Sequence, residues 1–275
     1  MKRIALFALI CLAVNAQSSI FSSSILPPSQ KSSALPLHGG AGRGSLNIVF
    51  IGNSITYGAE INHTTEAPPV RVSELLTAEG YEVNYRNCGV SGSTTVDWLP
   101  ERNSRIFQRM VAAADELAQK DGALIFTMML GTNDSAIDCC TGAPVAPADY
   151  RANIKKIVDY ILHRYPAAKV IINYPLWYHP HTYNATRYLH QGLERLQTYL
   201  PEIDALCKEY KKASPQRVFQ GSRKTFRAFQ NRTDLFVAED SSLGNGVKFY
   251  LHPNPEGAIL LAHFWTESIK QVLSK

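Results

Sequence analysis

Four short segments of this 275-residue chain contain the side chains that acyl transfer requires. "GNS" follows the apolar run 46–51, "GVSGSTT" and "GTND" lie further along, and "HPNPEG" precedes the last helical pattern. A serine hydroxyl becomes a good nucleophile when a base such as histidine takes its proton, and the resulting oxyanion needs N–H donors. Ser54 is the candidate nucleophile and His252 the candidate base. The backbone N–H groups of Ser54 and Gly92 and the side chain of Asn133 are the candidate oxyanion donors.

Each of these residues also has a purely structural interpretation. Ser54 is a good helix N-cap, and His252 lies in a typical helix-start sequence. Gly92 suits a turn, and Asn133 with its neighbour suits an Asx turn. The structural interpretations are reasonable one at a time, but they do not explain why all four segments occur together and in order.

Alternating strand and helix patterns predict the elements that position these residues. The predicted strands are apolar runs or β-rich segments, at 46–51, 81–87, 123–130, 168–175 and 216–220. The predicted helices lie between or after them, at about 70–80, 104–120, 149–166, 187–211 and 254–273. On the second helix, we expect Ile106, Met110, Ala113 and Leu117 to face the core.

Strands that alternate with amphipathic helices indicate an α/β fold with a parallel sheet covered on both faces. Ligands of such sheets bind at the carboxyl ends of the strands. Three of the four candidate segments directly follow predicted strands, and we expect all four to converge at that edge. Residues 46–275 are sufficient for one domain of this kind.

The four segments resemble the conserved blocks of the SGNH hydrolases, a superfamily of GDSL-like esterases and lipases. The resemblance covers about residues 46–273 and implies a three-layer α/β/α sandwich, similar to flavodoxin, with a parallel sheet of about five strands. It implies that Ser54 is the nucleophile, His252 the base, and Gly92 and Asn133 oxyanion donors. Asn53 stands where the family commonly has Asp, and we expect little effect because both residues suit the turn.

Phe249 is the more important departure, because SGNH hydrolases usually have an Asp three residues before the histidine to orient its ring. Three groups remain as the partner of His252: a backbone carbonyl, a carboxylate of the loop "AEDSSLGNG" (Glu239 or Asp240), or Asp134. The sequence favours the carbonyl, because "SSLGNG" predicts no fixed geometry for the two loop acids. Asp134 is expected to stabilise its own turn.

The segment "YPLWYHPHTY" at 174–183 leaves the fourth predicted strand towards the same edge. Aromatic side chains suit sugar rings and acyl chains, so Trp177, Tyr178 and Tyr183 are candidate substrate contacts. Packing under the following helix is the alternative. His179 and His181 lack a nearby Cys, Asp or Glu to complete a ligand set, so the sequence predicts no metal site there. No cofactor is implied.

The first 16 residues have the pattern of a cleaved signal peptide, with a basic start, an apolar run and "VNA" before Gln17. The run is short for a bilayer span, and bulky Ile10 disfavours a lipid anchor at Cys11. We therefore expect export to the periplasm or medium, without stable membrane insertion. Residues 17–45 are rich in Ser, Pro and Gly and predict an irregular leader.

Removing residues 1–16 takes away Lys2 and Arg3 and no acidic residue, which lowers the net charge from +5 to +3. Such a weak balance indicates no nucleic-acid partner. The remaining cysteines match no zinc pattern, and their spacing does not determine any disulfide. These cysteines are Cys88, Cys139, Cys140 and Cys207.

The sequence thus favours an exported serine esterase that removes short acyl groups, above all acetyl groups, from small molecules or glycans. The alternatives are a lipid esterase, a thioesterase, and a carbohydrate-binding relative that has lost catalysis. The sequence offers no long apolar lid for a fatty chain, which disfavours the lipid esterase.

Overall fold

The computed structural model describes residues 42–138 and 140–274 of the chain. The predicted signal peptide and almost all of the predicted leader lie outside these residues. The main elements are, in order, β1 Ser45–Gly52, α1 Ser54–Tyr57, α2 Pro68–Ala78, β2 Glu82–Asn87, α3 Arg105–Ala118, β3 Ala123–Met129, α4 Pro147–Arg164, β4 Lys169–Ile172, α5 Leu189–Ala213, β5 Val218–Gln220, α6 Lys224–Phe229, β6 Glu239–Asp240, β7 Lys248–Phe249 and α7 Pro255–Leu273. Short 3₁₀ turns lie at Thr95–Trp98, Pro100–Arg102 and Thr233–Leu235.

Five parallel strands form the central sheet in the order β2-β1-β3-β4-β5. The predicted parallel sheet of about five strands is therefore confirmed. The chain moves outward from β1 to β2 and then returns across β1 to β3. This reversal creates a crevice at the carboxyl ends of β1 and β3, which is where ligands of doubly wound sheets bind.

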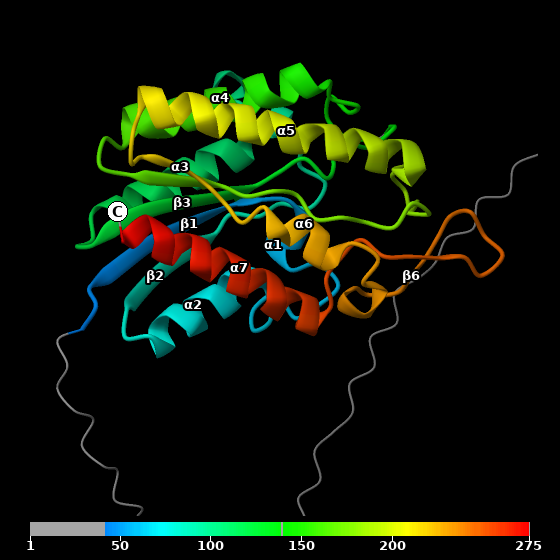
Figure 1. The fold of residues 1–275 in the computed structure, drawn as a ribbon, viewed down its shortest axis with the longest axis horizontal. Helices are drawn as coiled ribbons and strands as arrows, with labels where there is room; N and C mark the ends of the chain where they lie inside the picture. Colours follow the sequence, from blue (N-terminus) through cyan, green and yellow to red (C-terminus); the bar gives the residue numbers. More distant parts are fainter. Residues whose placement is uncertain (1–41, 139, 275) are drawn as a thin grey trace, which may run out of the picture. The chain divides into compact units, whose positions relative to one another are not determined.

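Helices cover both faces of the sheet and complete the predicted three-layer sandwich (Figure 1). Parallel crossovers are right-handed, so a connection that runs in the opposite direction along the sheet places its helix on the opposite face. Accordingly, α2 lies on one face with α7, and α3, α4 and α5 lie on the other (Figure 1).

The apolar positions of the helices pack against the sheet. On α7, Ala258, Leu261, Trp265 and Ile269 are all buried, and the Trp265 ring stacks on Phe50 of β1 with centroids 5.8 Å apart. On α3 the four predicted residues all pack against the core, but two other residues are more deeply buried than two of them. Phe107 and Ala114 are buried with Met110 and Leu117, whereas Ile106 and Ala113 are only partly buried. The larger Phe107 ring takes the core position and packs on Tyr160 of α4.

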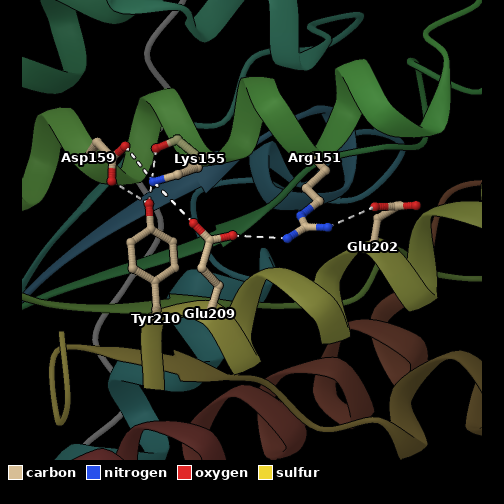
Figure 2. Close-up of polar contacts among 6 residues, drawn as sticks. All are labelled: Arg151, Lys155, Asp159, Glu202, Glu209 and Tyr210. Carbon is tan, nitrogen blue, oxygen red and sulfur yellow. Dashed lines mark hydrogen bonds and ion pairs between the residues drawn. The ribbon is translucent and has the colours of Figure 1, made fainter. Parts of the chain in front are cut away.

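A polar network joins α4 to α5 along their outer surface (Figure 2). Arg151 lies 2.9 Å from Glu209, and Lys155 lies 2.9 Å from Asp159 and 3.5 Å from Glu209. The hydroxyl of buried Tyr210 donates to Asp159 at 2.6 Å. Exposed ion pairs of this kind contribute little individually to the free energy of unfolding.

β6 and β7 form a separate antiparallel pair just before α7. Among the described residues, no helix is both long and apolar enough to cross a membrane. Cys88 and Cys207 are buried free thiols, and burial raises the pKa of Cys88 to about 11 and that of Cys207 to about 12. Cys139 lies outside the described residues.

Candidate active site

The turn after β1 leaves the hydroxyl of Ser54 free of any capping role. Asn53 is the N-cap of α1, because its side-chain oxygen accepts from the backbone N–H of Ile55 at 3.1 Å. Ser54 is the first helical residue, so its own backbone N–H has no partner within the helix. Gly52 permits this sharp turn, since a Cβ there would lie 2.0 Å from the Thr56 hydroxyl. Ser54 is therefore not the N-cap.

His252 contacts Ser54 across the carboxyl edge of the sheet. Its Nε2 lies 3.0 Å from the Ser54 Oγ, and each of the two residues is 7% exposed. The start of α7 does not need the histidine, because Asn254 caps the helix by accepting from the Gly257 N–H at 2.9 Å, and Pro255 is its first residue. The imidazole is thus available to accept a proton from the serine.

Glu239 occupies the other side of the imidazole, with Oε1 2.9 Å from Nδ1 of His252. The prediction that a backbone carbonyl orients His252 is therefore wrong. A carboxylate at Nδ1 favours the tautomer with its proton on that nitrogen, which leaves the Nε2 lone pair directed at the serine. Sequence reasoning named Glu239 only as an alternative.

The β6–β7 pair explains how Glu239 replaces the missing Asp. Glu239 pairs directly with Phe249, and side chains of directly opposed residues lie on the same face of an antiparallel pair. Phe249 is itself buried, 1% exposed, so its ring packs in the core while the carboxylate comes from the neighbouring strand. The N–H of Val237 donates to the carbonyl of His252 at 2.9 Å and holds this strand beside the histidine.

The "SSLGNG" segment is also ordered, contrary to expectation. It closes a tight hairpin in which the Ser241 N–H donates to the Val247 carbonyl at 2.9 Å and the Gly244 N–H to the Ser241 carbonyl at 3.0 Å. The glycines at 244 and 246 both have positive φ, which such a turn requires. A glycine-rich turn between extended residues is a hairpin signal, and it could have identified Glu239 from the sequence.

The loop that carries Gly92 lies against the end of β1. The Val90 N–H and the Ser93 hydroxyl both donate to the Gly52 carbonyl, at 3.0 and 3.3 Å. Gly92 has a φ of +77°, and a Cβ at this position would meet no atom within 4 Å. Its backbone conformation, rather than a shortage of space, therefore requires glycine.

Asn133 follows β3, and its carboxamide is held at both ends. The side-chain nitrogen donates to the Ser93 carbonyl at 2.8 Å, and the oxygen accepts from the Tyr188 hydroxyl at 2.7 Å. Because a carboxamide has two N–H donors, this arrangement leaves one for an oxyanion. Sequence reasoning did not identify Tyr188, since nothing in its sequence context indicates that it reaches Asn133.

Asp134 links the loop that contains Asn133 to the loop that contains Gly92 and Thr95. One carboxylate oxygen accepts from the Thr95 N–H at 2.9 Å and also from the Thr95 hydroxyl. Asp134 is completely buried, and this burial raises its pKa from 3.8 to about 6. Asp134 therefore does more than the sequence predicted, because its carboxylate also contacts Thr95 of the other loop.

The family can be assigned once this geometry is combined with the sequence comparisons. The model of the GDSL-like lipase/acylhydrolase family matches residues 50–259, which include all four candidate segments. The chain belongs to this family. It is an SGNH-type carboxylic-ester hydrolase, as predicted. No curated protein gives a significant match.

Solved structures of the same fold resemble the hydrolase at low sequence identity. The aryl esterase of M. smegmatis has a TM-score of 0.55 and 18% identity over 82% of this chain and 99% of its own. The carbohydrate acetylesterase Est24 of Sinorhizobium meliloti has a TM-score of 0.54 and 18% identity, with the same shares covered. The family 3 carbohydrate esterase of Clostridium thermocellum has a TM-score of 0.55 and 15% identity over 84% of this chain and 98% of its own. These likenesses show the fold.

Two of the three predicted aromatic contacts lie inside the hydrolase. Trp177 is 3% exposed and packs edge-on against Phe236, with centroids 5.9 Å apart. Tyr178 is fully buried, its hydroxyl lies 2.9 Å from that of Ser135, and its ring packs on Tyr188. The prediction that these two contact substrate is therefore corrected: they are core residues. Tyr183 is half-buried.

A cavity of about 440 Å³ adjoins the Gly92 loop of the hydrolase. Its lining is rich in hydroxyl groups and includes Arg105 at the start of α3; the hydroxyl residues include Ser91, Ser93, Ser104 and Thr141. A larger cavity of about 930 Å³ lies between α5, β5 and α7, and none of the candidate catalytic residues lines it. Gly92 is the one candidate catalytic residue among those that line the smaller cavity.

Proposed function

We propose that this protein is an exported esterase that removes short acyl groups, especially acetyl groups, from carbohydrates. Ser54, His252 and Glu239 would act as nucleophile, base and orienting acid. The observation that carries the proposal is the continuous chain of contacts from the Ser54 Oγ to His252 Nε2 at 3.0 Å and from His252 Nδ1 to Glu239 Oε1 at 2.9 Å. These are hydrogen-bond distances suited to direct proton transfer.

In the first half-reaction, the Ser54 Oγ attacks the ester carbonyl while His252 Nε2 takes the hydroxyl proton. The carbonyl π electrons move to the oxygen, which becomes an oxyanion. Glu239 stabilises the imidazolium through the Nδ1 proton and does not itself need to accept that proton. The tetrahedral intermediate then collapses, the C–O bond to the sugar breaks, and the imidazolium donates its proton to the departing alcohol.

The oxyanion would be stabilised by the backbone N–H groups of Ser54 and Gly92 and by the free N–H of Asn133. These donors are fixed before substrate arrives, since Asn133 is bonded to Ser93 and Tyr188. Fixed donors require little reorganisation when the charge develops, which is why such donors contribute strongly to catalysis. In the second half-reaction, His252 activates a water molecule that attacks the acyl-enzyme and releases the acid.

Two observations support a carbohydrate ester as substrate. The lining of the cavity beside Gly92 includes several hydroxyl groups together with Asp97 and Arg105, and such polar groups suit a hydroxylated leaving group. Two of the structural neighbours are described as a carbohydrate acetylesterase and a carbohydrate esterase. Half-buried Tyr183 remains a candidate contact for a sugar ring.

Hydrolysis of p-nitrophenyl acetate, butyrate and decanoate by the mature protein tests the proposal, with Ser54→Ala as the inactive control. We expect the acetyl ester to be cleaved fastest and a serine-directed phosphonate to label Ser54. Faster cleavage of the decanoyl ester would instead support a lipid esterase. Absence of both turnover and labelling would support a non-catalytic carbohydrate-binding protein.

Export is part of this proposal and rests on the sequence of residues 1–16. Mass spectrometry of the protein recovered outside the cytoplasm should give a mature chain that begins at Gln17. Recovery of the full chain inside the cells would contradict export and leave the esterase chemistry unaffected.

A further inference from the structure

The carboxylate of Glu60 lies beside the Glu239–His252 pair and has no role in the mechanism above. One ligand atom each from Glu60, Glu239 and His252 lies within 4.8 Å of the other two. Glu60 follows α1, and its backbone is tied close to the nucleophile because the N–H groups of both Gly58 and Ala59 donate to the Ser54 carbonyl at 3.0 Å. The same turn therefore supplies both the serine and this second carboxylate.

The Glu60 carboxylate has no cationic partner in the part of the chain that the structure describes. It forms no hydrogen bond or ion pair with residues 42–138 or 140–274, and the residue is exposed. A second carboxylate, that of Glu239, lies close to the Glu60 carboxylate, and the Glu239 side chain is only 18% exposed. Two neighbouring carboxylates repel each other, and a bound cation removes that repulsion.

The ligand types indicate which cation fits. One imidazole nitrogen and two carboxylate oxygens form a set that binds Zn²⁺, whereas Mg²⁺ prefers oxygen ligands only. Tetrahedral zinc ligands stand about 3.4 Å apart. The His252 Nδ1 and Glu239 Oε1 already lie 2.9 Å apart, and the exposed side chain of Glu60 can move to complete the set.

We propose that Glu60, Glu239 and His252 bind a divalent transition-metal cation such as Zn²⁺, and that this binding inhibits the esterase. The inhibitory part rests on the proposed function, whereas the binding part does not. The physical reason for inhibition is the tautomer of His252. A neutral imidazole that coordinates metal through Nδ1 carries its one proton on Nε2. Nε2 then faces Ser54 as a donor and can no longer accept the serine proton.

The test is titration of p-nitrophenyl acetate hydrolysis with zinc chloride in the wild type and in Glu60→Gln. Glu60 takes no part in the proposed reaction, so we expect similar turnover of both proteins without zinc. Half-inhibition of Glu60→Gln should require about 10-fold more zinc or more, because losing a ligand should cost at least as much as losing an outer-shell partner. Magnesium chloride at the same concentrations should not inhibit the wild type.

Glu256→Gln is the matched control, because Glu256 is an exposed acid in the first turn of α7, four residues after His252, and is not part of the three-residue group. It should keep the wild-type zinc sensitivity. Glu60→His retains a zinc ligand and should restore sensitivity. Equal zinc sensitivity of the wild type and Glu60→Gln, or an insensitive wild type, would overturn the proposal.

Isothermal titration with zinc chloride separates this inference from the proposed function. If the wild type hydrolyses no ester, the proposed function fails, yet zinc binding that is weakened in Glu60→Gln still supports the metal site. If the ester is hydrolysed and neither protein binds zinc, the metal site fails and the esterase proposal is unaffected.

Discussion

Replacing Glu239 with Gln tests the least expected feature of the site. Gln has nearly the same shape as Glu, but it lacks the charge and can present an N–H₂ donor to His252 Nδ1. The ring then keeps a lone pair on Nδ1 and carries its proton on Nε2, where it faces Ser54. The wild-type contact at 2.9 Å is therefore replaced by one that favours the unproductive tautomer.

The size of the effect follows from the burial of this contact. Replacing a fully buried triad Asp by its amide costs about 10⁴-fold in kcat in a serine protease. The Glu239 side chain is 18% exposed, so water can partly replace the carboxylate and the loss should be smaller. We expect kcat to fall by about 10³-fold, which corresponds to about 4 kcal/mol of transition-state stabilisation.

Steady-state hydrolysis of p-nitrophenyl acetate measures this loss, with Asp240→Asn as the control. Asp240 is the next residue on β6, but its side chain is 81% exposed and pairs with Lys248, so its variant should stay within twofold of the wild type. Thermal unfolding of both variants checks that the hairpin is intact. A folded Glu239→Gln within tenfold of the wild type would refute the reasoning, because the serine and histidine would then work without a carboxylate.

Three further predictions follow from neighbouring contacts. Asn133→Ala should lower kcat about 10²-fold through loss of an oxyanion donor. Tyr188→Phe should lower kcat by about 5-fold, because loss of the Tyr188 hydroxyl only frees the Asn133 carboxamide to rotate. A change confined to KM would contradict both predictions. Asn53→Asp keeps the oxygen that caps α1 and should leave turnover within threefold, whereas Asn53→Ala should lower the free energy of unfolding by about 1 kcal/mol in urea denaturation. Burial raises the pKa of Asp134 to about 6, so the folded state holds this proton more tightly than the unfolded state. The stability that results is greatest below pH 4 and is lost as pH rises through 6. Relative to Asp134→Asn, the free energy of unfolding of the wild type should fall by about 2 kcal/mol between pH 4.5 and 7.5. A difference between the two proteins that stays the same over this range would show that Asp134 titrates normally.

The residues that could be predicted from the sequence are those encoded by local patterns. Ser54 follows a buried strand and a glycine turn, Asn133 follows another strand, and His252 precedes a capped helix. Because β1 and β3 are neighbours in a parallel sheet, the ends of their strands had to meet at one edge. This adjacency brings Ser54 and Asn133 together, whereas the position of His252 beside them was predicted from the four segments taken together.

The remaining features depend on how distant segments pack, and local patterns do not encode this. Glu239 faces His252 because the β6–β7 register sets it opposite Phe249, and a shift by one residue would turn its side chain to the other face. Tyr188 reaches Asn133 from a segment 55 residues away. Trp177 and Tyr178 had the composition of a binding loop, but packing against Phe236 and Tyr188 buries them. The sequence by itself determined the fold and brought Ser54 and His252 forward as candidates, since strand and helix patterns and the four short segments are local features. Tertiary structure decided which acid orients the base and which aromatic side chains meet solvent, because register and helix packing depend on contacts far apart in the chain.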